Sequence, residues 1–193
     1  MVNGLSHYLR QAWRKPGIET KSRLIEWRRG NSLEVVDRPL RLDRARALGY
    51  KAKKGFIVVR VKIGRGGRKR EMTKVKGRKT GKQTNRKVLK MSYQWVAEIR
   101  AARKFKNMEV LNSYWIGQDG MNYFYEVIMI DPGRPEIKND RTLGWISNGN
   151  NSKRVERGLT SAAKKSRGMK GKKGRSPKRK VRPSLRAWNR QGK

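Results

Sequence analysis

The sequence predicts an α+β fold in which helices cover a small, mainly antiparallel sheet. The clearest strand is residues 56–63, where one face carries four β-branched side chains in strict alternation, Ile57, Val59, Val61 and Ile63. The pair Asp119-Gly120 lies between two apolar-rich runs, which is a strong signal for a hairpin. The predicted order is strand, helix, strand, basic loop, helix, strand, strand, and this order suggests an α+β domain.

Residues 1–32 are expected to form a basic, helical N-terminal arm. Apolar residues recur at helical spacing from Leu5 to Trp13, and Lys15-Pro16-Gly17 ends this first helix. A second short helix through Leu24 and Trp27 is expected to follow and to stop near Gly30.

The core is expected in residues 33–131. It starts with a strand over Leu33–Asp37 and a helix over Leu42–Leu48, which Gly49 ends. Ser92 is expected to cap a helix that reaches Phe105 and buries Trp95, Ile99 and Ala102. The two hairpin strands are predicted over Val110–Ile116 and Tyr123–Ile130.

Two segments are predicted to lack regular structure. Residues 64–90 are expected to form a glycine-rich basic loop, and such a long stretch inside a compact domain is usually functional, or disordered when the protein is isolated. After Asp131, prolines and repeated Gly and Asn residues indicate an irregular basic extension over residues 132–193.

The charge is strong and unevenly distributed. Lys and Arg number 52 against 14 Asp and Glu, a net charge of +38. Residues 91–152 are neutral, with seven basic and seven acidic side chains, whereas residues 153–193 carry seventeen basic and one acidic. Cationic segments of this kind repel themselves and cannot bury their charges unpaired, so they require a polyanion such as RNA or DNA.

Several classes of protein are excluded by composition. There is no cysteine and one histidine, so a disulfide framework and a transition-metal site are not expected, and no cofactor is predicted. No apolar run approaches the ~18–20 residues of a membrane span, and the N-terminus lacks the apolar core of a signal peptide. A basic helix on a membrane surface is a weaker alternative, because the most basic segments lack a sustained apolar face.

Enzyme signatures also fail. Residues 77–83 resemble a phosphate-binding P-loop but have three residues between the glycines instead of four, and Gln83 replaces the Mg²⁺-binding Ser or Thr. Residues 64–67 lack the third glycine of the dinucleotide fingerprint, and His7 has no acidic residue near it in sequence. No catalytic residue and no small-molecule substrate are therefore predicted.

Nucleic-acid binding fits the residues best. Arg can bind a phosphate with two hydrogen bonds and stack on a base, and glycines between basic residues let the backbone approach a phosphate. We expect RNA contacts from basic residues of the arm, the core, the loop and the tail: Arg10, Arg14, Lys15, Arg44, Arg46, Lys51, Lys53, Lys54, Arg65, Arg68, Lys69, Arg70, Arg78, Lys79, Lys82, Arg86, Arg157, Lys164, Lys165, Arg167, Arg182 and Arg186.

RNA is favoured over DNA as the partner. No helix-turn-helix, zinc finger or basic zipper is visible. Tyr8, Trp13 and Trp27 near the basic arm could stack on unpaired bases, although packing against the domain is the alternative for them. A protein that packages duplex DNA is a second hypothesis, and an RNA-modifying enzyme is a third that lacks a visible catalytic group.

Five blocks of sequence resemble a known family. Leu40–Lys53 contains RLDRARALGYKAK, and the other blocks are Gln94–Phe105, Glu109–Gly120, Arg157–Gly168 and Val181–Ala187. Together, and in this order, they resemble the archaeal and eukaryotic large-subunit ribosomal protein family L-fifteen-e over nearly the full length.

The resemblance implies a fold and a function. The fold would be a β-α-β-α-β-β core with a four-stranded sheet and helices on both faces, and the basic loop and tail would correspond to residues 64–90 and 150–193. The function would be that of a structural protein of the large ribosomal subunit, in the cytoplasm, that binds large-subunit ribosomal RNA and neighbouring ribosomal proteins and supports assembly and translation. It would not be a homo-oligomer or a membrane protein.

Overall fold

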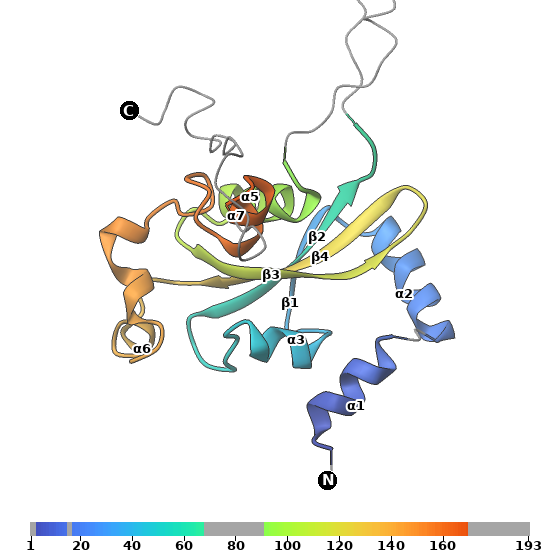
Figure 1. Cartoon of the computed structure of the whole chain (residues 1–193), viewed down its shortest axis with the longest axis horizontal. Helices are drawn as coiled ribbons and strands as arrows, with labels where there is room; N and C mark the ends of the chain where they lie inside the picture. Colours follow the sequence, from blue (N-terminus) through green and yellow to red (C-terminus); the bar gives the residue numbers. More distant parts are fainter. Residues whose placement is uncertain (1–2, 15–16, 68–90, 170–193) are drawn as a thin grey trace, which may run out of the picture.

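The computed structural model describes residues 3–14, 17–67 and 91–169. Its centre is a sheet of four strands, β1 (Leu33–Val36), β2 (Phe56–Gly64), β3 (Glu109–Gln118) and β4 (Asn122–Ile130). The strands lie in the order β1-β2-β4-β3, and every neighbouring pair is antiparallel (Figure 1). The predicted α+β class with a four-stranded antiparallel sheet is therefore confirmed.

The hairpin predicted at Asp119-Gly120 joins β3 to β4. The Asp119 carboxylate accepts hydrogen bonds from the backbone amides of Met121 (2.7 Å) and Asn122 (2.5 Å), which fixes the turn. The pairing of β3 with β4 shifts register twice, between Val110 and Asn112 and between Trp115 and Gly117. Such bulges bend a strand and raise its twist.

Helices lie on both faces of the sheet. On one face α5 (Tyr93–Lys104) packs on β2, β3 and β4, and α7 (Ser161–Ser166) packs on α5 and β3, around Trp95, Val127 and Met129. The other face is covered by residues from α2 (Ile18–Arg29), α3 (Leu42–Ala47), α6 (Pro135–Lys138) and the 3₁₀ helix η1 (Gly144–Ser147). Figure 1 shows α5 and α7 above the sheet, and α3 and α1 (Leu5–Ala12) below it.

Local signals in the sequence begin and end these helices where expected. The Ser92 hydroxyl accepts a hydrogen bond from the Trp95 amide and caps α5. Gly49 follows α3 with φ +98°, a conformation that favours glycine. In α5, Trp95 and Ile99 are buried as predicted, and Ala102 is half-buried against the same cluster.

The segment after Asp131 differs from the prediction of irregular structure. It contains α6, η1, η2 (Gly149–Asn151) and α7, and it supplies buried side chains to both faces of the sheet, namely Ile137, Leu143, Ile146, Val155, Ala162 and Ala163. Helices this short are not stable alone and form because the core packs against them, so propensity alone does not reveal them.

Candidate nucleic-acid interface

Arginines gather where α1 packs against α3. The Asp43 carboxylate, in the first turn of α3, is buried and lies 4.0 Å from Arg10 Nε and 3.9 Å from Arg41 Nη2. The Arg41 guanidinium stacks on the Trp13 ring, 4.9 Å from its centroid. These contacts hold α1 beside α3. Four exposed predicted residues lie on these two helices or just after α1, and we name them together the α1–α3 surface: Arg10, Arg14, Arg44 and Arg46.

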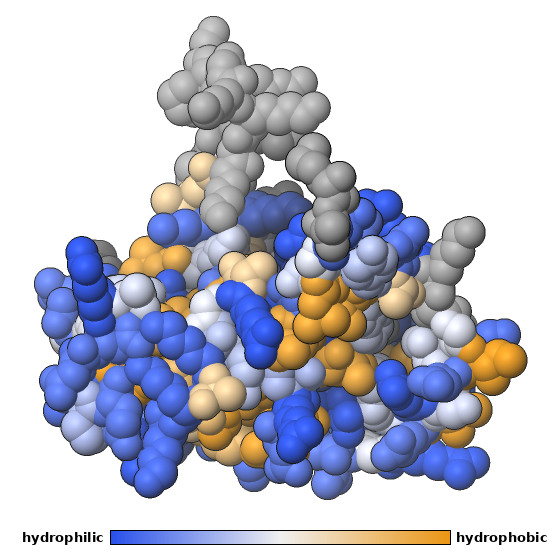
Figure 2. Space-filling view, turned by 90° about the horizontal axis from the view of Figure 1, so that it is seen from below, coloured by the Kyte–Doolittle hydropathy of each residue, from blue (hydrophilic) through white to orange (hydrophobic). Residues whose placement is uncertain are grey.

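Most of the α1–α3 surface is available to a partner. All four of its arginines are exposed. The side chains of Arg14, Arg44 and Arg46 make no ion pair or hydrogen bond to another described residue. Figure 2, which views the molecule from the side of α1 and α3, shows mainly hydrophilic residues with smaller hydrophobic patches between them. Such a surface can meet a phosphate backbone without first breaking internal contacts.

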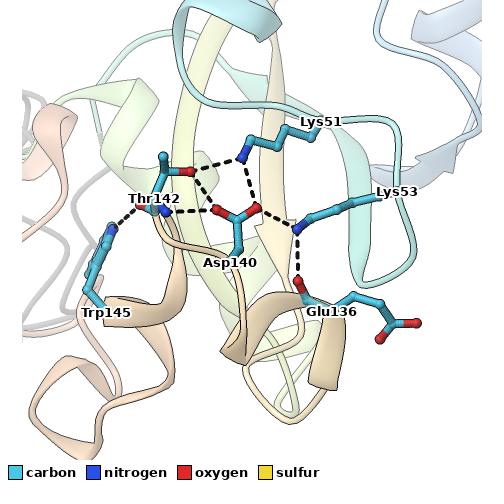
Figure 3. Close-up of polar contacts among 6 residues, drawn as sticks. All are labelled: Lys51, Lys53, Glu136, Asp140, Thr142 and Trp145. Atoms are coloured by element: carbon cyan, nitrogen blue, oxygen red, sulfur yellow. Dashed lines mark hydrogen bonds and ion pairs between the residues drawn. The ribbon is translucent and has the colours of Figure 1, made fainter.

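Lys51 and Lys53 lie in a different environment (Figure 3). Their ammonium groups contact one carboxylate oxygen of Asp140, at 2.8 Å and 2.5 Å. Lys51 also donates to the Thr142 hydroxyl (2.9 Å), and Lys53 donates to the Glu136 carbonyl (2.8 Å). The hydrogen bonds from Lys51 and Lys53 are the main reason that the pKa of Asp140 is well below its usual value. Both lysines therefore hold the loop before β2 against the segment after α6, whereas Lys54 beside them is exposed.

Arg65, Arg157 and Arg167 also have internal partners. Arg65 donates to the Asp119 carbonyl (2.8 Å) and stacks on Tyr123, with its guanidinium 5.0 Å from the ring centroid. Arg157 donates to the Asn150 carbonyl (2.5 Å), and Arg167 donates to the Gly158 carbonyl (3.1 Å). On α7, Lys165 is exposed and Lys164 is half-buried.

The remaining predicted RNA-binding residues lie outside the described residues. They are Lys15, Arg68, Lys69, Arg70, Arg78, Lys79, Lys82, Arg86, Arg182 and Arg186.

The three aromatic residues near the arm differ in burial. Trp27 is buried against Phe124 and covered by Arg60, so it packs in the core. Trp13 is half-buried beneath Arg41, whereas Tyr8 is 56% exposed. Two further exposed tryptophans, Trp115 and Trp145, were not singled out by the sequence analysis.

Two buried carboxylates were also missed. Glu98 of α5 accepts hydrogen bonds from the hydroxyls of Ser113 and Thr160, both at 2.5 Å, and burial raises its pKa to about 7. Glu126 of β4 accepts from the Tyr114 hydroxyl (2.5 Å) and from the Leu40 amide (3.1 Å), and burial raises its pKa. One lies on each face of the sheet, and each ties a distant segment to it. Their contacts are those of structural groups.

Neither a metal centre nor a membrane span is found in the described part of the chain. Over these ranges no three His, Cys, Asp or Glu side chains gather as metal ligands would. Nor does any described helix combine the length and apolar character needed to cross a bilayer.

Comparison with known proteins identifies the family. The model of the family described as ribosomal L15 matches residues 4–188. The chain is similar to "Large ribosomal subunit protein eL15" of Methanospirillum hungatei, with 51% identity and 97% of each chain covered. It is also similar to the protein of the same name from Methanocella arvoryzae, with 48% identity and 100% of each chain covered. The resemblance seen in the five sequence blocks is confirmed, and the chain belongs to the ribosomal L15 family.

Proposed function

We propose that this chain is a structural constituent of the large ribosomal subunit and binds large-subunit ribosomal RNA. Membership of the ribosomal L15 family supports the ribosomal role, since both named relatives are large-subunit proteins. The protein would act in the cytoplasmic ribosome, without catalysis, by stabilising folded RNA during assembly and translation. Its other partners would be neighbouring ribosomal proteins.

The observation that carries RNA binding is the α1–α3 surface. Arg14, Arg44 and Arg46 are exposed and have no described partner, although the chain has acidic groups that bind other cations internally. Guanidinium groups bind phosphate oxygens through paired hydrogen bonds, and phosphate contacts dominate the affinity of proteins for nucleic acids. We infer that these arginines contact RNA phosphates, together with the exposed Lys54 and Lys165.

A second set of predicted residues would support the fold instead of contacting RNA. These side chains donate hydrogen bonds to groups of the chain itself, so they hold the fold together and are less available to phosphates. They are Lys51, Lys53, Arg157 and Arg167. The basic segments at residues 64–90 and 150–193 remain proposed RNA contacts, and the division into arm, core and extension remains a proposed domain organisation.

Sedimentation of a cell lysate through a sucrose gradient at high salt tests the proposal. The chain should stay with the large subunit as ionic strength rises, and RNase should release it while DNase should not. Loosely held electrostatic binders leave as salt increases. Recovery of the chain with DNA, or at the top of the gradient without RNase, would reject the proposal in favour of a packaging protein.

A further inference from the structure

A pocket on the α5 side of the molecule is not explained by phosphate binding alone. It lies between the C-terminal end of α5, the start of β3 and the loop before α7, and has a volume of about 460 Å³. Pockets that take small molecules are commonly of roughly 300–1,000 Å³. Apolar, acidic and basic residues all contribute to its lining, which consists of Ala102, Arg103, Lys106, Met108, Glu109, Lys153, Val155 and Glu156.

The loop that forms one wall is held firmly. Lys153 has φ +52° and is the only non-glycine residue with positive φ among the described residues. Its backbone amide donates to the Glu109 carboxylate at 2.7 Å. Two residues later the Val155 carbonyl accepts from the Trp95 indole at 3.0 Å, and the Val155 side chain is buried in the core. Unusual backbone conformations persist where surrounding contacts fix them, and they are frequent at binding sites.

The polar groups of the pocket have different capacities left for a ligand. Glu109 already accepts the Lys153 amide. Glu156 lies 3.8 Å from Arg103 Nε, which is an ion pair too long for a hydrogen bond, so its carboxylate retains acceptor capacity. Lys106 and Lys153 are exposed, and their ammonium groups make no contact with another described residue. The pocket is thus lined by half-buried apolar side chains, one available carboxylate and exposed cations.

This combination matches a nucleotide better than an acidic peptide. An unpaired base needs an apolar surface and hydrogen-bond partners for its edge, while its phosphate needs cations. A carboxylate accepts from an exocyclic amino group such as cytosine N4, but it repels an acidic side chain. A second hollow of about 450 Å³ shares Lys106 and Met108 with the first and adds Lys104, Phe105, Asn107 and Asp131. The Asp131 carboxylate is paired with Arg134 at 3.4 Å, so a polynucleotide could continue across both hollows.

We propose that the pocket receives one unpaired nucleotide of the bound RNA, whose base carries an amino group. The base would lie on the half-buried side chains of Ala102 and Met108, with its amino group donating to Glu156. Its phosphate would lie between Lys106 and Lys153. The inference rests on the proposed RNA-binding function and adds a base preference to it.

Titration of the full-length protein with CMP and with UMP, followed by amide chemical shifts, tests this inference. UMP is a matched ligand, since uracil carries a carbonyl oxygen where cytosine carries the amino group. CMP should shift the amides of Ala102, Met108 and Val155 in particular, and should bind about tenfold more tightly than UMP. Glu156→Met should remove this tenfold difference, whereas Glu136→Met, at an exposed position on α6, should preserve it.

Three results would overturn the inference. One is equal binding of CMP and UMP, and another is shifts spread over exposed basic residues with none in the pocket. The third is an Asp- and Glu-rich peptide that shifts the same amides and displaces CMP, because the pocket would then belong to a protein segment. Binding of large-subunit RNA to the same sample is measured separately. Tight RNA binding without the CMP response rejects the pocket alone, whereas failure to bind RNA rejects the proposed function.

Discussion

Arg44 and Arg46 differ from Lys51 and Lys53 although all four lie in one short basic stretch. The two arginines project from α3 and have no described partner, whereas the two lysines share the carboxylate of Asp140. That partner is 87 residues from Lys53 in the sequence. The composition of the chain therefore gives the number of cations. How many of them are available to RNA depends on which acidic groups the fold places beside them.

Arg154 is a half-buried cation whose partners lie within the fold. Its guanidinium donates to the carbonyls of Val110 (2.5 Å) and Leu111 (2.9 Å) in β3, and it stacks on Trp145 with 5.0 Å to the ring centroid. Both carbonyls lie at the register shift between Val110 and Asn112 in β3, an edge strand of the described sheet, where a bulge disrupts the regular pairing. Arg154 therefore stabilises the fold, whereas Arg44 is exposed on the surface.

Arg154→Met should give the largest effect. Two carbonyl acceptors lose a charged donor, and each such loss costs about 1–3 kcal/mol, so the free energy of unfolding should fall by about 3 kcal/mol. Urea denaturation followed by circular dichroism measures it. Lys138→Met, at an exposed position of α6, is the matched control and should change stability by less than about 0.5 kcal/mol. A similarly small change for Arg154→Met would mean that the paired cations do not support the fold.

Glu98 and Asp140 differ in the same way: Glu98 is buried and makes no ion pair with another described residue, whereas Asp140 is paired with two lysines. The pKa of Glu98 is raised from 4.5 to about 7, chiefly by burial. Between these pH values the folded state binds more protons than the unfolded state, so stability should fall as pH rises from about 4.5 to about 7, by about 2 kcal/mol. Glu98→Gln should flatten this dependence.

Thermal unfolding at a series of pH values measures the Glu98 effect. Glu136→Gln serves as the control, because that exposed carboxyl should leave the pH dependence unchanged. If Glu98→Gln retained the wild-type slope, the loss of stability would have to come from other groups.

The double variant Arg44→Glu/Arg46→Glu tests the free cations. Removal of two phosphate contacts should weaken binding to large-subunit RNA about tenfold and reduce the slope of log affinity against log salt by about 1.4. Stability should change by less than about 0.5 kcal/mol, because neither arginine has an internal partner among the described residues.

Filter binding at several salt concentrations provides the measurement for these arginines. Lys138→Glu/Arg141→Glu makes the same change of charge away from the α1–α3 surface and is the control. Equal losses for both double variants would show that only net charge matters to RNA binding.

Most of the fold could be predicted from local patterns. The alternation in β2, the Asp-Gly turn and the Ser92 cap each act within a few residues, so they appear directly in the sequence. The short helices between Pro135 and Ser166 could not, because their stability comes from side chains such as Ile137 and Val155 packing on distant strands.

The candidate interface could be predicted only in part. Glu126 alternates with the buried Phe124 and Ile128, and Glu98 lies three residues after Trp95, so both patterns place a carboxyl on a buried face. Nothing local distinguishes Lys53 from Lys54, however, because the Asp140 partner of Lys53 is supplied by a distant segment. Charge patterns therefore predict an RNA-binding protein but overestimate the number of available cations.

Asp140→Asn should have the smallest effect on stability, and it directly tests the pairing of Asp140 with Lys51 and Lys53. The lysine contacts lower the pKa of Asp140 from its usual 3.8, so the stability they contribute is present above about pH 4 and is lost as the pH falls further. The wild type should therefore lose more stability than Asp140→Asn when the pH falls from about 5 to about 3. Solvent screens this partly exposed cluster, which keeps the effect below that of the buried groups.

Single variants of Lys51, Lys53 and Arg46 separate the paired cations from the free ones. The Lys53 side chain is 29% exposed and that of Lys51 is 45% exposed, so Lys53→Met should lower the melting temperature more than Lys51→Met. Arg46→Met should not lower it, but should weaken RNA binding, whereas Lys53→Met should leave the RNA affinity of the folded protein unchanged. Weaker RNA binding by Lys53→Met without loss of stability would contradict this. Lys53 would then exchange Asp140 for a phosphate when RNA binds. The paired lysines and the unpaired arginines would differ only in the free protein.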